Sequence, residues 1–288
     1  MDPNPFDSEP LALRRRGLLV GVSFVIAAIV TVASVLGLIA SWPYQKETED
    51  WVLQARGQDI GNLFAVVVLV VSAVRMRAGS FRAAQWWMGT LLYLLYAYIV
   101  YAFAVHFGRL FLVYVAILGL VFFTLVIALS ARERTSVHPS GLARQFAAWV
   151  LIGTGALFAL LWLSELVPAT VTGQVPPSLT AAGLIVSPIH VIDLSVVLPG
   201  MIVIGVLTLR GNMAGLSLTV PALVFSVLMG SSIIAAILLV VATGEIGGFI
   251  PMVMVAVVVV ASLVAAIAYA RKTHIARPAA VKAGHRGI

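Results

Sequence analysis

His190 and Asp193 are the residues whose types and spacing are best suited to chemistry. Asp193 follows His190 by three residues in an otherwise apolar stretch, His190-Val-Ile-Asp193. One turn apart on a helix, the two side chains can touch. A histidine beside a carboxylate can transfer protons as an acid–base pair, and the same two groups can bind a ligand.

A second polar group surrounds Asp59. At 1.5 Å of rise per helical residue, Asp59 lies about 24 Å from Arg75, and Asp193 lies about 25 Å from Arg210. If these arginines mark one membrane surface, both aspartates lie just inside the other boundary of a hydrocarbon core of about 30 Å. A carboxylate at that depth must face protein or water.

We therefore expect one outward-opening polar pocket in which Asp59 and Asp193 face each other and His190 is hydrogen-bonded to Asp193. The predicted binding residues are Gln58, Asp59, Asn62, His106, His190 and Asp193. The alternative is that each aspartate only caps a helix, because a carboxylate is favoured at a helix N-terminus by capping and by the dipole.

Other chemistries find little support in the sequence. The chain has no cysteine, which excludes disulfides and thiolate sites. His106, His190 and Asp193 could offer ligands to a metal, and the two histidines could offer ligands to haem. We expect no metal and no other cofactor. Two or three ligand-type residues occur by chance in most membrane proteins, and His106 falls in a loop. Apart from Arg75, which marks the inner surface, no Asp, Glu, Lys, Arg or His lies in the inner half of an apolar run, so a deep proton relay is not expected.

The elements that must position these residues are membrane helices. Sixty-one per cent of the 288 residues are apolar and 10% are charged, which is too few charged residues to cover a soluble domain. The predicted fold is all-α, a polytopic transmembrane bundle of about eight spans. The apolar runs cover residues 17–40, 60–76, 83–105, 110–130, 146–167, 189–209, 216–243 and 249–270. They form a single transmembrane domain, 17–270, between a lead at 1–16 and a basic tail at 271–288.

The distribution of lysine and arginine predicts the orientation. If the N-terminus is cytoplasmic, fifteen of the 18 basic residues fall on the cytoplasmic side, and only Lys46, Arg56 and Arg109 fall outside. Cytoplasmic loops carry this excess in membrane proteins. We expect both termini in the cytoplasm and the protein in the cell inner (plasma) membrane. The net charge of +7 does not indicate nucleic acid, because the basic residues lie at helix ends.

An internal duplication would relate the two aspartates. Shifting the chain by 134 residues, which is 193 minus 59, superposes Asp59 on Asp193 and brings Arg75 within one position of Arg210. Halves with an even number of spans would be parallel repeats about an axis along the membrane normal. The predicted repeats are residues 17–130 and 146–270.

Prolines predict two irregular segments. Pro199-Gly200 lies inside the sixth run, where proline removes a backbone hydrogen bond and should kink the helix. The connection at 165–189 is the longest, and its weakly apolar stretch 179–186 could form a short interfacial helix.

Several segments resemble a family of uncharacterised bacterial multispanning membrane proteins. The resemblance rests on Gln58-Asp59, Tyr93-Leu-Leu-Tyr96-Ala-Tyr98, Leu110-Phe-Leu-Val-Tyr114-Val-Ala, and His190-Val-Ile-Asp193-Leu followed by Pro199. It covers most of residues 50–235. It implies a bacterial inner membrane and no particular chemistry.

Three functions are compatible with these features. The first is transport, or binding of a small ligand or lipid, through the outward-facing pocket. The second is an accessory or scaffold subunit that packs beside another membrane protein. The third, an enzyme of the outer leaflet that uses His190 and Asp193, is the reading we favour least. All three share the lipid bilayer as a partner and exclude nucleic acid.

Overall fold

The computed structural model describes residues 8–130, 136–139, 141–244 and 249–276. Its elements, in chain order, are α1 (Ser8–Ile39), η1 (Trp42–Tyr44), α2 (Glu49–Arg77), α3 (Phe81–Ala104), α4 (Phe111–Ser130), β1 (Ser136–Pro139), α5 (Gly141–Thr172), α6 (Pro177–Ala182), α7 (Pro188–Ile192), η2 (Asp193–Val197), α8 (Leu198–Leu209), α9 (Met213–Ala242), α10 (Phe249–Arg271) and β2 (Thr273–Ala276).

Long apolar helices dominate the structure. Among the described residues, eight helical segments are long and apolar enough to cross a membrane, and α7, η2 and α8 together make the sixth. Large apolar side chains face outward from them, such as Leu112 (74% exposed) and Val257 (62% exposed). Such surfaces are stable only against lipid. The protein is an integral multi-pass membrane protein. The predicted all-α bundle of about eight spans is confirmed.

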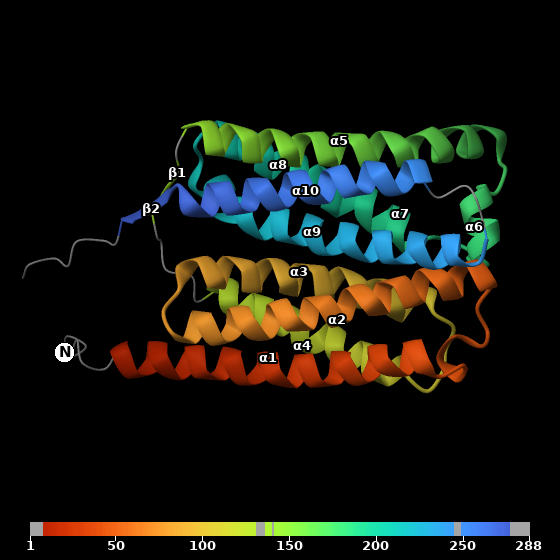
Figure 1. Cartoon of the computed structure of the whole chain (residues 1–288), viewed down its shortest axis with the longest axis horizontal. Helices are drawn as coiled ribbons and strands as arrows, with labels where there is room; N and C mark the ends of the chain where they lie inside the picture. Colours follow the sequence, from red (N-terminus) through yellow and green to blue (C-terminus); the bar gives the residue numbers. More distant parts are fainter. Residues whose placement is uncertain (1–7, 131–135, 140, 245–248, 277–288) are drawn as a thin grey trace, which may run out of the picture.

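The helices form two closed groups that lie side by side (Figure 1). In the first, α1 and α3 each pack against both α2 and α4; in the second, α5 and α9 each pack against both α8 and α10. Contacts of α2 with α9, of α3 with α9 and of α3 with α7 join the groups. The two groups occupy the ranges of the predicted repeats, and the duplication itself stays a prediction.

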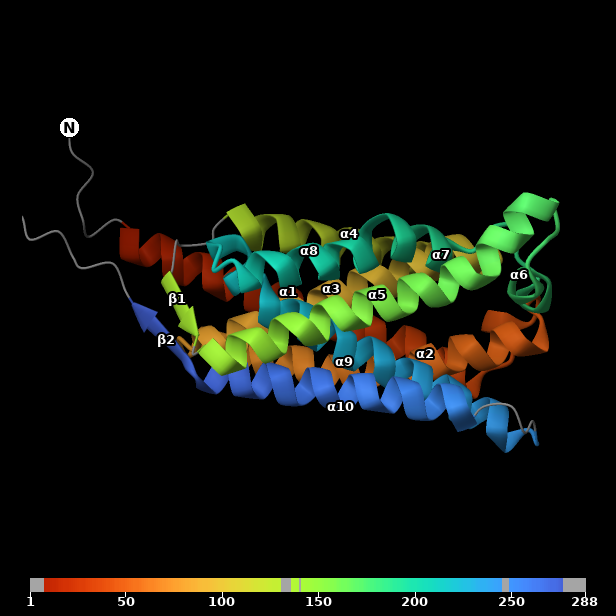
Figure 2. The ribbon, with the colours of Figure 1, turned by 90° about the horizontal axis from the view of Figure 1, so that it is seen from above.

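Both described chain ends lie at one end of the bundle (Figures 1 and 2). There β1 and β2 pair antiparallel, with Ser136 opposite Ala276, so the connection before α5 is tied to the segment after α10. The start of α1 at Ser8 lies within the predicted lead, which is therefore partly helical. Residues 1–7 of the lead and 277–288 of the basic tail lie outside the described residues.

The sixth span contains a π-helical turn where a simple kink was expected. In η2 the helix is wider, and the N–H of Leu198 donates to the carbonyl of Asp193, five residues earlier. Pro199, which has no N–H, follows immediately at the start of α8. The hydrogen-bond register thus shifts in the turn that precedes the proline. Single π turns within α-helices are frequent at functional sites.

The long connection of the second group is shorter than predicted. Helix α5 continues through Pro168 to Thr172. A short helix is present there as α6, slightly earlier than residues 179–186, and its place at the membrane interface stays a prediction.

Two glycines bring the groups together at the α2–α9 contact. Gly57 and Gly61 are one helical turn apart, and a Cβ atom at either position would collide with α9, at Ala236 and Ser232 respectively. Glycines at this spacing allow two membrane helices to approach closely. The contact fixes α9 against the turn of α2 that carries Asp59.

Gly61→Ala should lower the free energy of unfolding by about 1–3 kcal/mol, because the added methyl group overpacks the α2–α9 contact. Unfolding of the protein in lipid nanodiscs would measure the change. Gly153→Ala is the matched control, because nothing lies within 4 Å of a Cβ at Gly153. Equal stability of the two variants would contradict the close contact.

Candidate functional site

Asp59 lies in a closed polar core inside the first helix group. Its side chain is 2% exposed. The hydroxyl groups of Tyr44 and Tyr101 donate to its two carboxylate oxygens at 2.7 and 2.9 Å. Gly37 on α1 faces the same carboxylate, and a Cβ at this position would collide with it. The sequence therefore surrounds this aspartate with hydrogen-bond donors and leaves no space beside it.

Tyrosine rings fill the space around Asp59. The rings of Tyr101 and Tyr114 stack with centroids 5.0 Å apart, and Tyr98 lies 5.4 Å from Tyr101. Tyr44, in the connection between α1 and α2, is buried. This burial, together with the neighbouring carboxylate, raises the pKa of Tyr44 well above its usual value of 10. The Tyr44 phenol therefore stays protonated and remains a donor to Asp59 at physiological pH.

Gln58 and Asn62 connect this core to the second helix group. Asn62 is fully buried, accepts from Gln58 at 3.3 Å and donates to Ser34 at 3.4 Å. Gln58 also donates to the hydroxyl of Tyr93 at 2.6 Å, and it accepts from Ser232 of α9 at 3.3 Å. Gln58 thus links Asn62, inside the first group, to α9 of the second group.

A cavity of about 490 Å³ lies beyond Gln58, between α2, α3 and the helices of the second group. It reaches the end of the bundle opposite the chain termini, because Asp50 in the first turn of α2 and Val240 near the end of α9 line it. Its polar lining residues are Asp50, Gln54, Gln58, Thr154, Asp193, Ser226 and Ser232. The rest of the wall is apolar or aromatic. Few polar groups in a mainly apolar wall are typical of small-molecule sites.

Asp193 is the acidic group of this cavity that lies within the sixth span. The indole N–H of Trp162 on α5 donates to its carboxylate at 2.8 Å, and Tyr96 of α3 lies beside it. No described residue that lines the cavity is basic. Within the described part of the chain, no ion pair involves Asp193 either. The Asp193 carboxylate thus contacts neutral donors and borders the open volume of the cavity.

Comparisons with protein-family models, with curated proteins and with solved structures gave no match to this chain. No family is identified. The resemblance to uncharacterised bacterial membrane proteins accordingly stays a prediction, and the site is interpreted from its own geometry.

The predicted hydrogen bond between His190 and Asp193 is wrong. His190 is 7% exposed, and its ring packs against Trp162 with centroids 4.6 Å apart. The backbone N–H of Asp193 donates to the carbonyl of His190, but no hydrogen bond among the described residues joins the two side chains, and His190 does not line the cavity. His190 therefore supports the indole that donates to Asp193.

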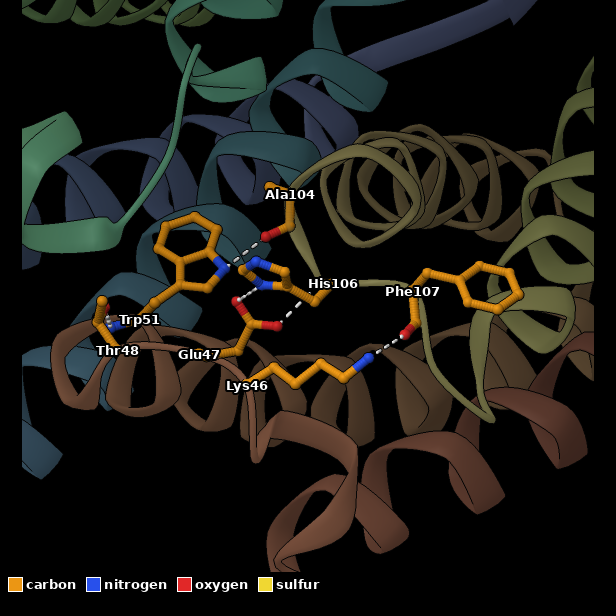
Figure 3. A network of polar contacts seen from close by, with 7 residues as sticks. All are labelled: Lys46, Glu47, Thr48, Trp51, Ala104, His106 and Phe107. Carbon is orange, nitrogen blue, oxygen red and sulfur yellow. Dashed lines mark hydrogen bonds and ion pairs between the residues drawn. The ribbon is translucent and has the colours of Figure 1, made fainter.

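His106 also does not line the cavity. Its Nδ1 lies 2.9 Å from a carboxylate oxygen of Glu47, and its backbone N–H donates to the other oxygen at 2.8 Å (Figure 3). Beside it, the indole of Trp51 donates to the carbonyl of Ala104 at 2.8 Å, and Lys46 donates to that of Phe107 at 3.2 Å. These contacts fasten the α1–α2 connection to the α3–α4 connection.

The predicted common pocket of both aspartates therefore needs correction. Gln58 and Asp193 line the cavity, whereas Asp59, Asn62, His106 and His190 do not. Among the described residues, no group of three His, Cys, Asp or Glu side chains could hold a metal ion. Sequence reasoning missed Trp162 and Tyr96, because both reach Asp193 from other helices and no local pattern connects them.

Removal of the two aspartates should change the stability of the protein to different extents. Asp59→Ala leaves two buried phenol donors without an acceptor and should lower the free energy of unfolding by about 2–5 kcal/mol. Asp193→Ala removes the acceptor of the half-buried Trp162 indole, but water in the open cavity can replace it, so the loss should be below about 1 kcal/mol. Thermal unfolding in nanodiscs compares them, and a larger loss in the Asp193 variant would contradict these assignments.

Proposed function

We propose that this membrane protein binds a small amphipathic molecule in the cavity beside Asp193, as a transporter or a ligand-binding protein. The observation that carries the proposal is the cavity itself. Its volume of about 490 Å³ falls within the range of small-molecule sites, about 300–1,000 Å³. Its carboxylate and amide groups suit the polar end of a ligand, and its apolar walls suit the rest.

The π turn gives further support. Asp193 and Val197, the first and last residues of η2, both line the cavity. A π turn is less regular than an α-helix and can change register at modest cost. The ligand would thus contact the segment of the sixth span that is best suited to move.

Neither alternative function has a specific observation in its favour. The proposed outer-leaflet enzyme needed His190 and Asp193 as an acid–base pair, and in the structure each side chain contacts the Trp162 indole instead of the other. No feature of the described surface singles out a partner subunit.

Filling the cavity should abolish ligand binding. Met254 of α10 lines the cavity, and a tryptophan there would occupy much of the volume. Met254→Trp should remove the thermal stabilisation that amphipathic ligands give to the protein in nanodiscs. Val257→Trp, on the lipid-facing side of the same helix, is the control and should retain it. Unchanged stabilisation in the Met254 variant would refute a ligand site here.

We also propose that the cavity opens outward and that both termini are cytoplasmic. The fifteen-to-three distribution of basic residues supports this orientation. The chain has no cysteine, so single cysteines at the exposed Ala78 and Gln174 report each side cleanly. In intact cells, a membrane-impermeant maleimide should label Gln174→Cys but not Ala78→Cys. The reverse pattern would invert the orientation.

A further inference from the structure

We propose that the ligand is a lipophilic cation, such as an alkylamine or quaternary ammonium compound, with its positive group beside Asp193. This inference rests on the function proposed above and names the chemical class of the ligand. It is drawn from the charge, the aromatic composition and the shape of the cavity wall.

The charge of the cavity wall is one-sided. Asp50 and Asp193 line the cavity, and among the residues that the structure describes no lysine, arginine or histidine does. Asp50 accepts from Gln54 at 2.7 Å, and Asp193 accepts from Trp162 at 2.8 Å, so both carboxylates have neutral partners only. An acidic residue within a membrane span is costly and is usually paired. A cationic ligand would supply the positive charge that the wall lacks.

Aromatic rings surround the place where that charge would bind. Trp162 donates to Asp193, and Phe158, one helical turn before it on α5, lines the same cavity. Tyr96 and Phe225 meet edge to face at 5.7 Å on the side formed by α3 and α9. Ring faces attract cations, most strongly where water is excluded, and aromatic walls of this kind recognise quaternary ammonium groups. Neutral or anionic head groups would gain nothing comparable.

The apolar part of the cavity wall suits a hydrocarbon chain. Met201, Met229 and Met254 line it from α8, α9 and α10, together with branched aliphatic residues such as Val258. Methionine side chains are flexible and adapt to apolar ligands of varied shape. The wall thus combines a carboxylate with rings on one side and adaptable apolar surface on the other.

Three probes of equal chain length test this inference: decyltrimethylammonium, neutral decyl glucoside and decyl sulfate. Their affinities for the protein in nanodiscs would be measured by equilibrium dialysis, with empty nanodiscs as the reference for partition into lipid. We expect the cation to bind about tenfold more tightly than either other probe, or better. Asp193→Asn should lower the affinity for the cation about tenfold and leave that for the glucoside unchanged.

Glu165→Gln is the matched control for charge. Glu165 lies on α5, does not line the cavity, and accepts from the backbone N–H of Ser178 at 3.1 Å. Its replacement removes the same charge and should leave the cation affinity unchanged. An equal loss in both variants would mean that only the general surface potential matters, which would overturn the assignment to Asp193.

The outcomes separate this inference from the proposed function. If all three probes bind equally and Met254→Trp removes all binding, the cavity is a ligand site without charge selection, and only the cation inference fails. If no probe binds, or if binding persists in Met254→Trp, the proposed function fails as well. Tighter binding of decyl sulfate than of the cation would also overturn the inference.

Discussion

The free-energy cost of placing a carboxylate inside a membrane span is the constraint on which this structure depends. Asp59 and Asp193 lie at similar distances along their helices from Arg75 and Arg210, and the protein accommodates the two carboxylates in different ways. Asp59 is enclosed by phenol donors and stacked rings. Asp193 keeps one strong neutral donor and faces a cavity. The phenol donors satisfy the Asp59 carboxylate within the protein. The cavity leaves space in which a bound ligand could interact with the Asp193 carboxylate.

The enclosed aspartate also helps to shape the open site. Gln58, next to it in the chain, is held by Asn62 and Tyr93 on one side and by Ser232 of α9 on the other. Gly57 and Gly61 allow α9 to approach closely at the same level. The first helix group thus acts as a rigid wall for the cavity, because its interior is filled and its contacts with α9 are tight. The second group contributes the π turn to the cavity wall, and we propose that this side adapts to the ligand.

The sequence was sufficient for the spans and for the positions of the acidic residues along them. Long apolar runs and the rise of a helix determine both, and neither depends on tertiary contacts. The sequence was not sufficient for the direction in which Asp193 points. The π turn that begins at this residue changes the rotation of the helix, and Trp162, 31 residues earlier in the chain, takes the hydrogen bond expected from His190. Tyr44 and Tyr101 likewise approach Asp59 from segments whose pairing only the packed bundle defines.

A density map of the protein in lipid nanodiscs, prepared with a bromine-labelled alkylammonium compound, would test the central claim most directly. We predict density for the compound in the cavity between η2, α5 and α9, with its positive group next to Asp193. We predict none beside Asp59, where tyrosine side chains should fill the space. A cavity closed by side chains, or the compound found only among the surrounding lipids, would contradict the account.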